Sequence, residues 1–316
     1  MKTFFAGAVA VFMLHASAHA LDKIRIGFAP AASSTPFPLA QKKGFMKEEG
    51  LDAEVIRMSS TIAAAALVSG EADYVTGISA LRGAIQGLPL KAVASYIQGS
   101  TQTLIARSDI KSVSDLKGKT ITIGTPGGSP DRPARLIVRH FGLQPEKDVK
   151  FAAGGLTEGR LARLQQGLID ATVVPVPVDL QAKKLGLNVL ARAYEIFNYP
   201  EGGLITTTMK IKTKPDEVKR VIRAGIKASR YIKANRDGTI QFLMEWQRID
   251  KDIATGTYEY LAKATNDSGS LSESGFRLII EEIKELARVS REIALTDVAD
   301  LSILKEAQRE LGIKGN

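Results

Sequence analysis

The same short pattern occurs twice in the sequence, as LVSGEAD at residues 67–73 and as LQQGLID at residues 164–170. Both copies have the form L-x-x-G-x-x-D, and their positions differ by 97 residues. Ile26-Gly27 and Ile123-Gly124 are separated by the same interval, and each pair ends a strand-like run. A repeat at a constant offset indicates two copies of one structural unit, so we expect the chain to form two similar lobes.

Strand and helix patterns alternate around the first copy. Residues 23–28 alternate as a strand that ends near glycine, and small residues then lead to Pro36 at a first helical position. This helix should end near Glu49, before Gly50, and a second strand should follow at residues 51–57. Because strand and helix continue to alternate, we predict an α/β fold in which each lobe has a mainly parallel sheet flanked by helices.

Two extended segments flank the second copy and predict a two-strand hinge. A strand at residues 90–97 leads through the polar turn at 98–100 into residues 103–106, and a second extended run covers residues 199–208. The remainder of the chain is helical in pattern and should pack back on the first lobe. The expected organisation is a signal peptide at 1–20, the first part of lobe 1 at 21–103, lobe 2 at 104–204, and a mainly helical second part of lobe 1 at 205–316.

The first 20 residues are typical of a secretory signal peptide. Lys2 gives a basic start, an apolar run extends from Phe4 to Leu14, and Ala18-His19-Ala20 forms an A-x-A cleavage site. The run is too short for a transmembrane helix, which needs about 20 apolar residues. The sequence contains no cysteine, which excludes disulfides, thiol chemistry and a lipid-attachment residue. We therefore expect cleavage after Ala20, a periplasmic location and no cofactor.

The chain is basic, with 43 Lys and Arg residues against 34 Asp and Glu residues. The net charge of +9 falls by one when Lys2 leaves with the signal peptide. The basic residues are scattered along helical stretches, without long runs or interleaved aromatic residues, so nucleic-acid binding has little support. A solvated basic surface accounts for most of this charge, and a mild preference for anionic ligands is the most that it indicates.

Several further landmarks occur in a fixed order between residues 21 and 310. They are Gly27 with the small-residue loop after it, residues 40–44 ahead of Gly50, the D-L-K-G-K stretch at 115–119, residues 142–143 and residues 167–177. This order resembles that of the aliphatic-sulfonate, taurine and nitrate binding proteins, which are substrate-binding components of ABC importers with a type II periplasmic-binding fold. The resemblance implies a monomeric periplasmic protein that captures a small molecule and delivers it to an ABC permease and ATPase at the inner membrane, without catalysis.

Candidate ligand-binding residues follow from the order of strands and helices. In open α/β sheets, ligands lie beyond the carboxyl ends of the strands, beside helix N-termini that favour negative charge. Four such loops occur at residues 31–35, 59–61, 127–132 and 156–158. Glycine lets a backbone approach a ligand closely and hydroxyls donate hydrogen bonds, although each Ser or Thr taken singly is more often a helix cap. The candidate residues are Ser33, Ser34, Ser60, Thr61, Ser79, Gly99, Ser100, Gly128, Ser129, Arg132, Thr157, Pro175 and Val176.

Arg132 is the best single candidate for a cationic contact. Its guanidinium could pair bidentately with a carboxylate or sulfonate, although a solvated surface position is equally expected. A ligand that bridges both lobes would stabilise a closed state that a membrane permease can recognise. Sulfonates, taurine, nitrate, aromatic carboxylates and pyrimidines are all bound by proteins resembling this one, so the ligand's identity stays open.

Enzymatic chemistry has little support. His140 is the one histidine after the signal peptide, and the loop at residues 127–131 lacks the last glycine of a nucleophile elbow. The chain after the signal peptide has too few His and Cys residues to build a metal site from them. G-K-T at residues 118–120 lacks the first glycine of a phosphate-binding loop. The alternatives that stay open are a sensor that reports its ligand to a membrane receptor and, with less support, an enzyme that resembles the pyrimidine synthase of thiamine biosynthesis.

Overall fold

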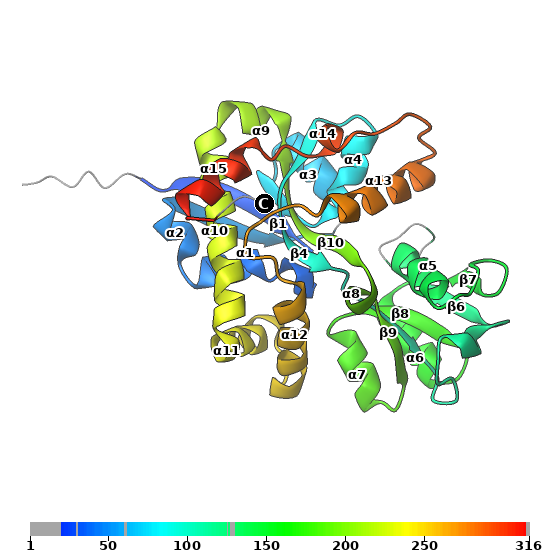
Figure 1. Cartoon of the computed structure of the whole chain (residues 1–316). Coiled ribbons are helices and arrows are strands. Elements are labelled where there is room, and N and C mark those ends of the chain that lie inside the picture. The colour runs from blue at the N-terminus through cyan, green and yellow to red at the C-terminus, as the bar shows by residue number, and fades with distance from the viewer. Residues whose placement is uncertain (1–19, 30, 60–61, 125, 127–129, 314–316) are drawn as a thin grey trace, which may run out of the picture.

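Two five-stranded sheets organise the chain, as a computed structural model shows (Figure 1). The structure describes residues 20–313, except residues 30, 60–61, 125 and 127–129. The strand order is β2-β1-β3-β10-β4 in the first sheet and β7-β6-β8-β5-β9 in the second. The first sheet contains β1 (Asp22–Phe28), β2 (Leu51–Arg57), β3 (Tyr74–Thr76), β4 (Leu90–Gly99) and β10 (Asn198–Thr207), and the second contains β5 (Gln102–Ala106), β6 (Thr120–Ile123), β7 (Lys150–Ala153), β8 (Ala171–Pro175) and β9 (Asn188–Arg192).

One strand in each sheet runs against the other four. β10 is antiparallel to β3 and β4, and β5 is antiparallel to β8 and β9. The strands at the opposite side of each sheet, β2-β1-β3 and β7-β6-β8, pair in parallel. The predicted α/β fold with two similar, mainly parallel sheets is therefore confirmed. We call the first sheet with its helices lobe 1 and the second sheet with its helices lobe 2.

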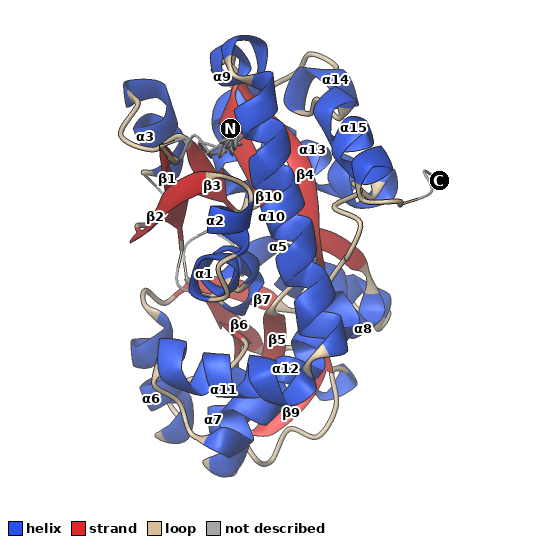
Figure 2. Cartoon of the chain, turned by 90° about the vertical axis from the view of Figure 1, so that its left-hand side faces the viewer, coloured by secondary structure: helices blue, strands red, loops and turns tan. Residues whose placement is uncertain are grey.

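Helices cover both faces of each sheet (Figure 2). In lobe 1, one buried apolar cluster joins the sheet to α1, α10, α11, α12 and α15, and a second cluster joins the other face to α3, α4 and α13. Lobe 2 has its own two clusters. The helices are α1 (Pro36–Lys42), α2 (Phe45–Glu48), α3 (Ala63–Ser69), α4 (Leu81–Ile85), α5 (Asp131–His140), α6 (Thr157–Gln165), α7 (Val178–Lys184), α8 (Ala193–Ile196), α9 (Thr208–Thr213), α10 (Pro215–Ala234), α11 (Arg236–Gln247), α12 (Lys251–Ala264), α13 (Glu273–Ala287), α14 (Leu295–Val298) and α15 (Ser302–Glu310), with short 3₁₀ turns η1 (Ala32–Ser34), η2 (Ile78–Ala80) and η3 (Ser114–Leu116).

The repeated L-x-x-G-x-x-D pattern ends a helix and begins a strand in both lobes. Leu67 and Leu164 are buried, and Gly70 and Gly167 have φ angles of +76° and +73°. This left-handed conformation ends α3 and α6 at glycine, because a residue with a Cβ atom adopts it only with strain. The spacing from leucine to glycine therefore sets where each helix stops.

The aspartate of the pattern ties two strands together. Asp73 Oδ2 accepts a hydrogen bond from the Arg25 backbone N–H of β1 at 2.8 Å. Asp170 Oδ2 accepts one from the Thr120 backbone N–H of β6 at 3.1 Å. Each carboxylate thus satisfies a backbone donor on the central parallel strand of its sheet, which explains why the pattern recurs with the topology.

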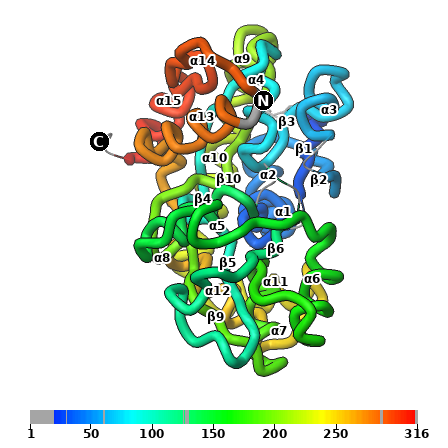
Figure 3. The backbone as a smooth tube through the Cα atoms, turned by 90° about the vertical axis from the view of Figure 1, so that its right-hand side faces the viewer, coloured from blue at the N-terminus to red at the C-terminus, as the bar shows by residue number. Residues whose placement is uncertain are grey.

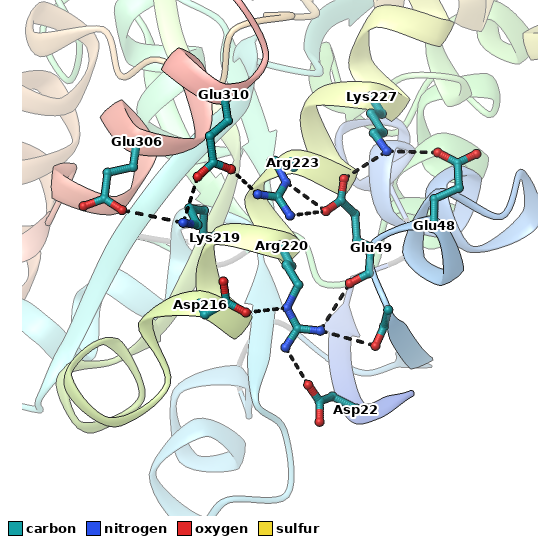
Figure 4. Close-up of polar contacts among 11 residues, drawn as sticks. Asp22, Glu48, Glu49, Asp216, Lys219, Arg220, Arg223, Lys227, Glu306 and Glu310 are labelled. Atoms are coloured by element: carbon teal, nitrogen blue, oxygen red, sulfur yellow. Dashed lines mark hydrogen bonds and ion pairs between the residues drawn. The ribbon is translucent and has the colours of Figure 1, made fainter. Parts of the chain in front are cut away.

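Helix α10 joins the C-terminal part of the chain to lobe 1 through four basic residues (Figure 4). They pair with acidic residues from β1, the end of α2, α10 itself and α15, and Glu49 at the centre of this network is buried. A network with a buried member contributes more than isolated surface pairs, which are worth at most about 1 kcal/mol each. The basic residues are Lys219, Arg220, Arg223 and Lys227, and their partners are Asp22, Glu48, Glu49, Asp216, Glu306 and Glu310.

The chain crosses between the lobes along two adjacent segments. The first runs from β4 through Ser100 and Thr101 into β5, and the second enters β10, where Asn198 pairs with Gly99. Sheet pairing therefore assigns β10 to lobe 1 from Asn198 onward, upstream of the boundary expected at residue 204. Helix α12 of lobe 1 also contacts α7 of lobe 2, where Lys184 Nζ lies 3.2 Å from Asp250 Oδ2.

Candidate functional site

The carboxyl ends of β1 and β3 in lobe 1 and of β6 and β8 in lobe 2 lead into the loops that the sequence singles out. In lobe 1, the loop after β1 contains Ser33 and Ser34 in η1, and the loop after β3 contains Ser79 in η2. Ser79 is exposed and Ser33 is partly exposed. Ser34 is buried, and its hydroxyl accepts a hydrogen bond from Thr76 Oγ1 at 3.3 Å.

Strand β10 brings the two loops of lobe 1 together. The Gly77 backbone N–H donates to the Gly203 carbonyl at 2.8 Å. A Cβ atom on Gly202 would lie 2.7 Å from the Ser33 carbonyl oxygen, so this position allows only glycine. The turns η1 and η2, which contain Ser33 and Ser79, therefore both contact β10 at its glycine pair.

Glu201 lies between the two crossing segments. Its Oε1 accepts a hydrogen bond from Ser100 Oγ at 2.7 Å, and its Oε2 accepts hydrogen bonds from the Thr101 N–H and Oγ1 at 2.9 and 2.7 Å. Burial raises the pKa of the Glu201 carboxyl, although the three donors oppose this shift. The sequence interpretation named Ser100 but missed Glu201, because the two are 101 residues apart.

The predicted residues around the crossings hold the hinge. The Gly99 carbonyl accepts a hydrogen bond from the Tyr260 hydroxyl at 2.7 Å, and a Cβ atom on Gly99 would lie 2.8 Å from Tyr194 Cβ. Pro175 pairs with Gln102. Val176 is 2 % exposed and belongs to the apolar cluster of lobe 1, although it directly follows β8 of lobe 2.

Four predicted residues, Ser60, Thr61, Gly128 and Ser129, lie outside the described part of the chain. Thr157, the hydroxyl candidate of the loop at 156–158, begins α6 and is partly exposed. Its Oγ1 accepts a hydrogen bond from Arg160 Nη2 at 3.3 Å. Arg160 is a residue that the sequence interpretation missed, because an arginine in an amphipathic helix has no signature of burial.

Arg132 lies on the first turn of α5 and reaches lobe 1. Its Nη1 is 3.3 Å from Glu285 Oε2 on α13, and its side chain is 14 % exposed. Figure 3 shows α5 facing α13 across the boundary between the lobes. A groove of about 440 Å³ lies between them, lined by Arg132, Glu281, Lys284, Glu285, Arg288, Val289 and Ser290. The predicted cationic contact is thus engaged in an ion pair between the lobes.

Glu282 is buried beside this ion pair. Its Oε2 accepts a hydrogen bond from the Tyr199 hydroxyl of β10. Burial raises the pKa of Glu282 to about 7, and the positive charge of Arg132 opposes the shift while Asp131 and Glu201 add to it. A carboxyl group that titrates near neutrality therefore lies where the two lobes meet.

A hollow of about 510 Å³ occupies the surface of lobe 1. Phe28 at the end of β1 and the stacked pair Phe242 and Trp246 on α11 form its apolar part. Lys42 and Glu245, which form an ion pair of 3.3 Å, contribute its polar rim. Its remaining lining residues are Pro38, Gln41 and Val55.

A family model described as NMT1/THI5 like matches residues 31–238 of the chain. The chain belongs to this family. The match covers β2 to β10, both crossings, and helices α1 to α10, and it begins after β1. The described part of the chain contains no group of three or more His, Cys, Asp or Glu residues that could hold a metal ion.

Relatives of this NMT1/THI5-like protein include binding proteins. It is 27 % identical over 249 residues to the riboflavin-binding protein RibY of Chloroflexus aurantiacus, an alignment that covers 73 % of this chain and 68 % of RibY. The aliphatic sulphonate binding protein SsuA of Escherichia coli superposes with a TM-score of 0.75 at 17 % identity, over 88 % of this chain and 97 % of SsuA. The nitrate-binding protein NrtA of Synechocystis PCC 6803 superposes with a TM-score of 0.72 at 17 % identity, over 92 % of this chain and 89 % of NrtA.

These comparisons confirm the periplasmic-binding fold that the resemblance implied. The desulfurization enzyme DszB shares the fold as well, with a TM-score of 0.67 at 14 % identity over 92 % of this chain and 99 % of DszB. The fold by itself therefore carries both binding and catalysis. The family and its binding relatives favour a binding role. Among the described residues, none of the helices combines the length and the apolar character needed to cross a bilayer.

Proposed function

We propose that this protein is an exported solute-binding protein that captures a small organic anion between its two lobes and delivers it to an ABC importer. The observation that carries the proposal is the presence of two lobes of the same topology, linked by two adjacent crossings. The family match and the binding relatives support it. Residues 1–20 would be the signal peptide removed after Ala20, and the mature chain would act as a monomer.

The candidate residues differ in their exposure and in the contacts that they already make within the protein. Ser33, Ser79 and Thr157 are exposed or partly exposed at the ends of strands, and we propose that they contact the ligand. Gly99 and Ser100 are engaged in the hinge, and Arg132 is paired with Glu285. Their proposed role is to set the balance between open and closed states, on which ligand affinity also depends.

Glu201 adds a constraint on the ligand. Among the described residues, its carboxylate has Ser100 and Thr101 as partners and forms no ion pair with Lys or Arg. A ligand that presents an N–H group toward the hinge would find an acceptor there, so an anion that also carries an amine or a nitrogen heterocycle suits the site. The hydrogen bonds from Ser100 and Thr101 fix the carboxylate in position for that contact.

A ligand screen on refolded, ligand-free protein tests the proposed function. Sulfonates, taurine, nitrate, aromatic carboxylates, pyrimidines and riboflavin would be compared by thermal unfolding, because a ligand present at 100 times its Kd stabilises the folded state by about 2.7 kcal/mol. We expect one chemical class to raise the Tm and to lower the radius of gyration in small-angle X-ray scattering as the lobes close. An unchanged Tm with every compound, or a bound compound that leaves the radius unchanged, would refute the two-lobe capture mechanism.

Two further measurements separate the alternatives. An enzyme on this fold would convert the bound compound. For a binding protein, we expect mass spectrometry to recover the ligand unaltered after long incubation. Substituting Ser79→Ala and Thr157→Ala should weaken binding, whereas Ser108→Ala, an exposed serine at the end of the first strand of lobe 2, should leave affinity unchanged. Uptake by membrane vesicles that contain the matching permease and ATPase would distinguish an importer component from a sensor.

A further inference from the structure

Two arginines of α6 lie beneath the strand-end loops of lobe 2. Arg160 is 2 % exposed and donates hydrogen bonds to the carbonyls of Gly155 and Val173 and to the hydroxyl of Thr172. Arg163, one turn later on the same face, donates to the Gly154 carbonyl at 2.6 Å. Both guanidinium groups therefore hold the loop that links β7 to α6.

Arg160 also reaches the loop after β6. A Cβ atom on Gly124, the first residue after that strand, would lie 3.4 Å from Arg160 Nη1. The guanidinium thus lies directly behind the backbone at the point where the chain turns toward α5. Gly124 is partly exposed and Gly155 is exposed, so solvent reaches the outer side of this backbone. Gly124 and Gly155, whose N–H donates to the Gly124 carbonyl at 3.2 Å, therefore meet over one buried cation.

Within the part of the chain that the structure describes, neither guanidinium group forms an ion pair with a carboxylate. Among the described residues, no Asp or Glu oxygen lies within 4.0 Å of a nitrogen of Arg160 or Arg163, and their polar contacts are with carbonyl and hydroxyl oxygens. The residues that the structure does not describe include no Asp or Glu, so they cannot supply a side-chain carboxylate either. Burial lowers the pKa of the Arg160 guanidinium, the charge of the exposed Glu158 opposes this shift, and the neighbouring Arg163 adds to it.

A buried charge without an ion-pair partner is unfavourable, because the low local dielectric strengthens its field while solvent cannot screen it. Carbonyl and hydroxyl oxygens satisfy the guanidinium N–H groups, but they leave the net charge in place. An anion bound at the exposed side of Gly124 and Gly155 would lower this cost. The first turn of α6 adds backbone N–H groups that favour the same sign of charge, and it already carries the exposed Glu158.

We propose that lobe 2 holds the negatively charged oxygens of the ligand over Gly124 and Gly155, with Arg160 and Arg163 supplying the opposite charge from behind the backbone. This assignment rests on the proposed function and names the group of the ligand that lobe 2 recognises. The chemistry is that of a carboxylate or a sulfonate, which are monoanions of similar geometry. Arg160 acts here as a positioning residue through the loop backbone, in contrast to the direct contact expected of Arg132.

Charge-matched probes test the assignment. Ethanesulfonate and propionate would be compared with the neutral analogues ethyl methyl sulfone and propionamide by calorimetry on the intact mature chain. Arg160→Gln and Arg163→Gln should each weaken binding of the anions at least tenfold, which is about 1.4 kcal/mol, and should leave any binding of the neutral analogues unchanged. Arg139→Gln is the control, because Arg139 is an exposed residue of lobe 2 and its replacement removes the same charge.

The outcomes distinguish this assignment from the proposed function. If a neutral compound from the wider screen binds and closes the lobes while the anions do not bind, the arginine assignment fails and solute capture stands. Equal losses of affinity in R139Q and R163Q would also overturn it, because they would indicate a general effect of net charge. Arg163 is partly exposed, so R163Q provides the test even where R160Q destabilises the lobe, and urea unfolding of each variant would establish its folding.

Discussion

Replacing Glu282 by glutamine should make the protein more stable at alkaline pH and change it little at acid pH. Burial raises the pKa of Glu282 from an ordinary value of 4.5 to about 7 in the folded protein. Between these two values the unfolded chain releases the proton while the folded chain keeps it, so the free energy of unfolding falls as the pH rises. Above pH 7 the folded protein carries the full cost of ionising a buried carboxyl group.

The size of the effect follows from that interval. At 1.36 kcal/mol per pH unit, the cost above pH 7 is about 3 kcal/mol, and at about pH 5 it is still below about 1 kcal/mol. Glutamine has no charge to bury and its amide oxygen can still accept the hydrogen bond from Tyr199. We therefore expect the stability difference between E282Q and the natural protein to grow by about 2.5 kcal/mol between about pH 5 and about pH 8.

Urea unfolding of both proteins at several pH values measures this difference. Glu281→Gln provides the control, because Glu281 is the exposed neighbour on the same helix. Its replacement should produce no comparable trend with pH. A difference between E282Q and the natural protein that is the same at both pH values would show that the carboxyl group does not titrate between them, and the reasoning from burial would be wrong.

Two other substitutions probe the packing of lobe 2 and the contact between the lobes. Gly154→Ala should destabilise the protein by about 1–3 kcal/mol, because its Cβ atom would lie 2.2 Å from Thr122 Cγ2. The helical Gly159 has no neighbour within 4 Å of a Cβ atom, so Gly159→Ala should instead stabilise the protein by up to about 1 kcal/mol in the same urea unfolding assay. Glu285→Gln removes the partner of Arg132 and should weaken ligand binding about two- to fivefold at low salt, which is the range of an exposed ion pair. In concentrated salt the substitution should have no effect, because salt screens the pair. Stronger ligand binding by E285Q in calorimetry would contradict a role for this contact in closing the lobes.

The fold could be predicted because its determinants are local. Gly70 and Gly167 adopt a left-handed conformation that ends a helix, and Asp73 and Asp170 bind a backbone N–H of the neighbouring strand. A pattern of seven residues therefore specifies a helix end, a strand start and a strand pair. Two copies of such a pattern at one offset predict two lobes of equal topology, and the strand orders of the two sheets agree with that prediction.

The site was harder to predict because its polar contacts join distant segments. The hydrogen bond from Ser100 to Glu201 spans 101 residues, and the ion pair from Arg132 to Glu285 spans 153. Hydroxyl and glycine content identified the loops of lobe 1 that meet at β10. That content could not show that Ser34 is buried, or that Val176 belongs to the apolar cluster of the other lobe.

The basic composition illustrates the same difference between sequence and structure. Counting charges gives a net +9 that a solvated surface could explain. In the folded chain, the basic residues of α10 are balanced by acidic partners from three other segments, whereas Arg160 is buried with carbonyl and hydroxyl partners alone. Net charge sums the paired and the unpaired basic side chains, so it cannot show which of them forms no ion pair. The proposed preference for an anion therefore rests on one buried guanidinium behind Gly124, and the charge-matched variants of Arg160, Arg163 and Arg139 separate that local effect from the overall charge.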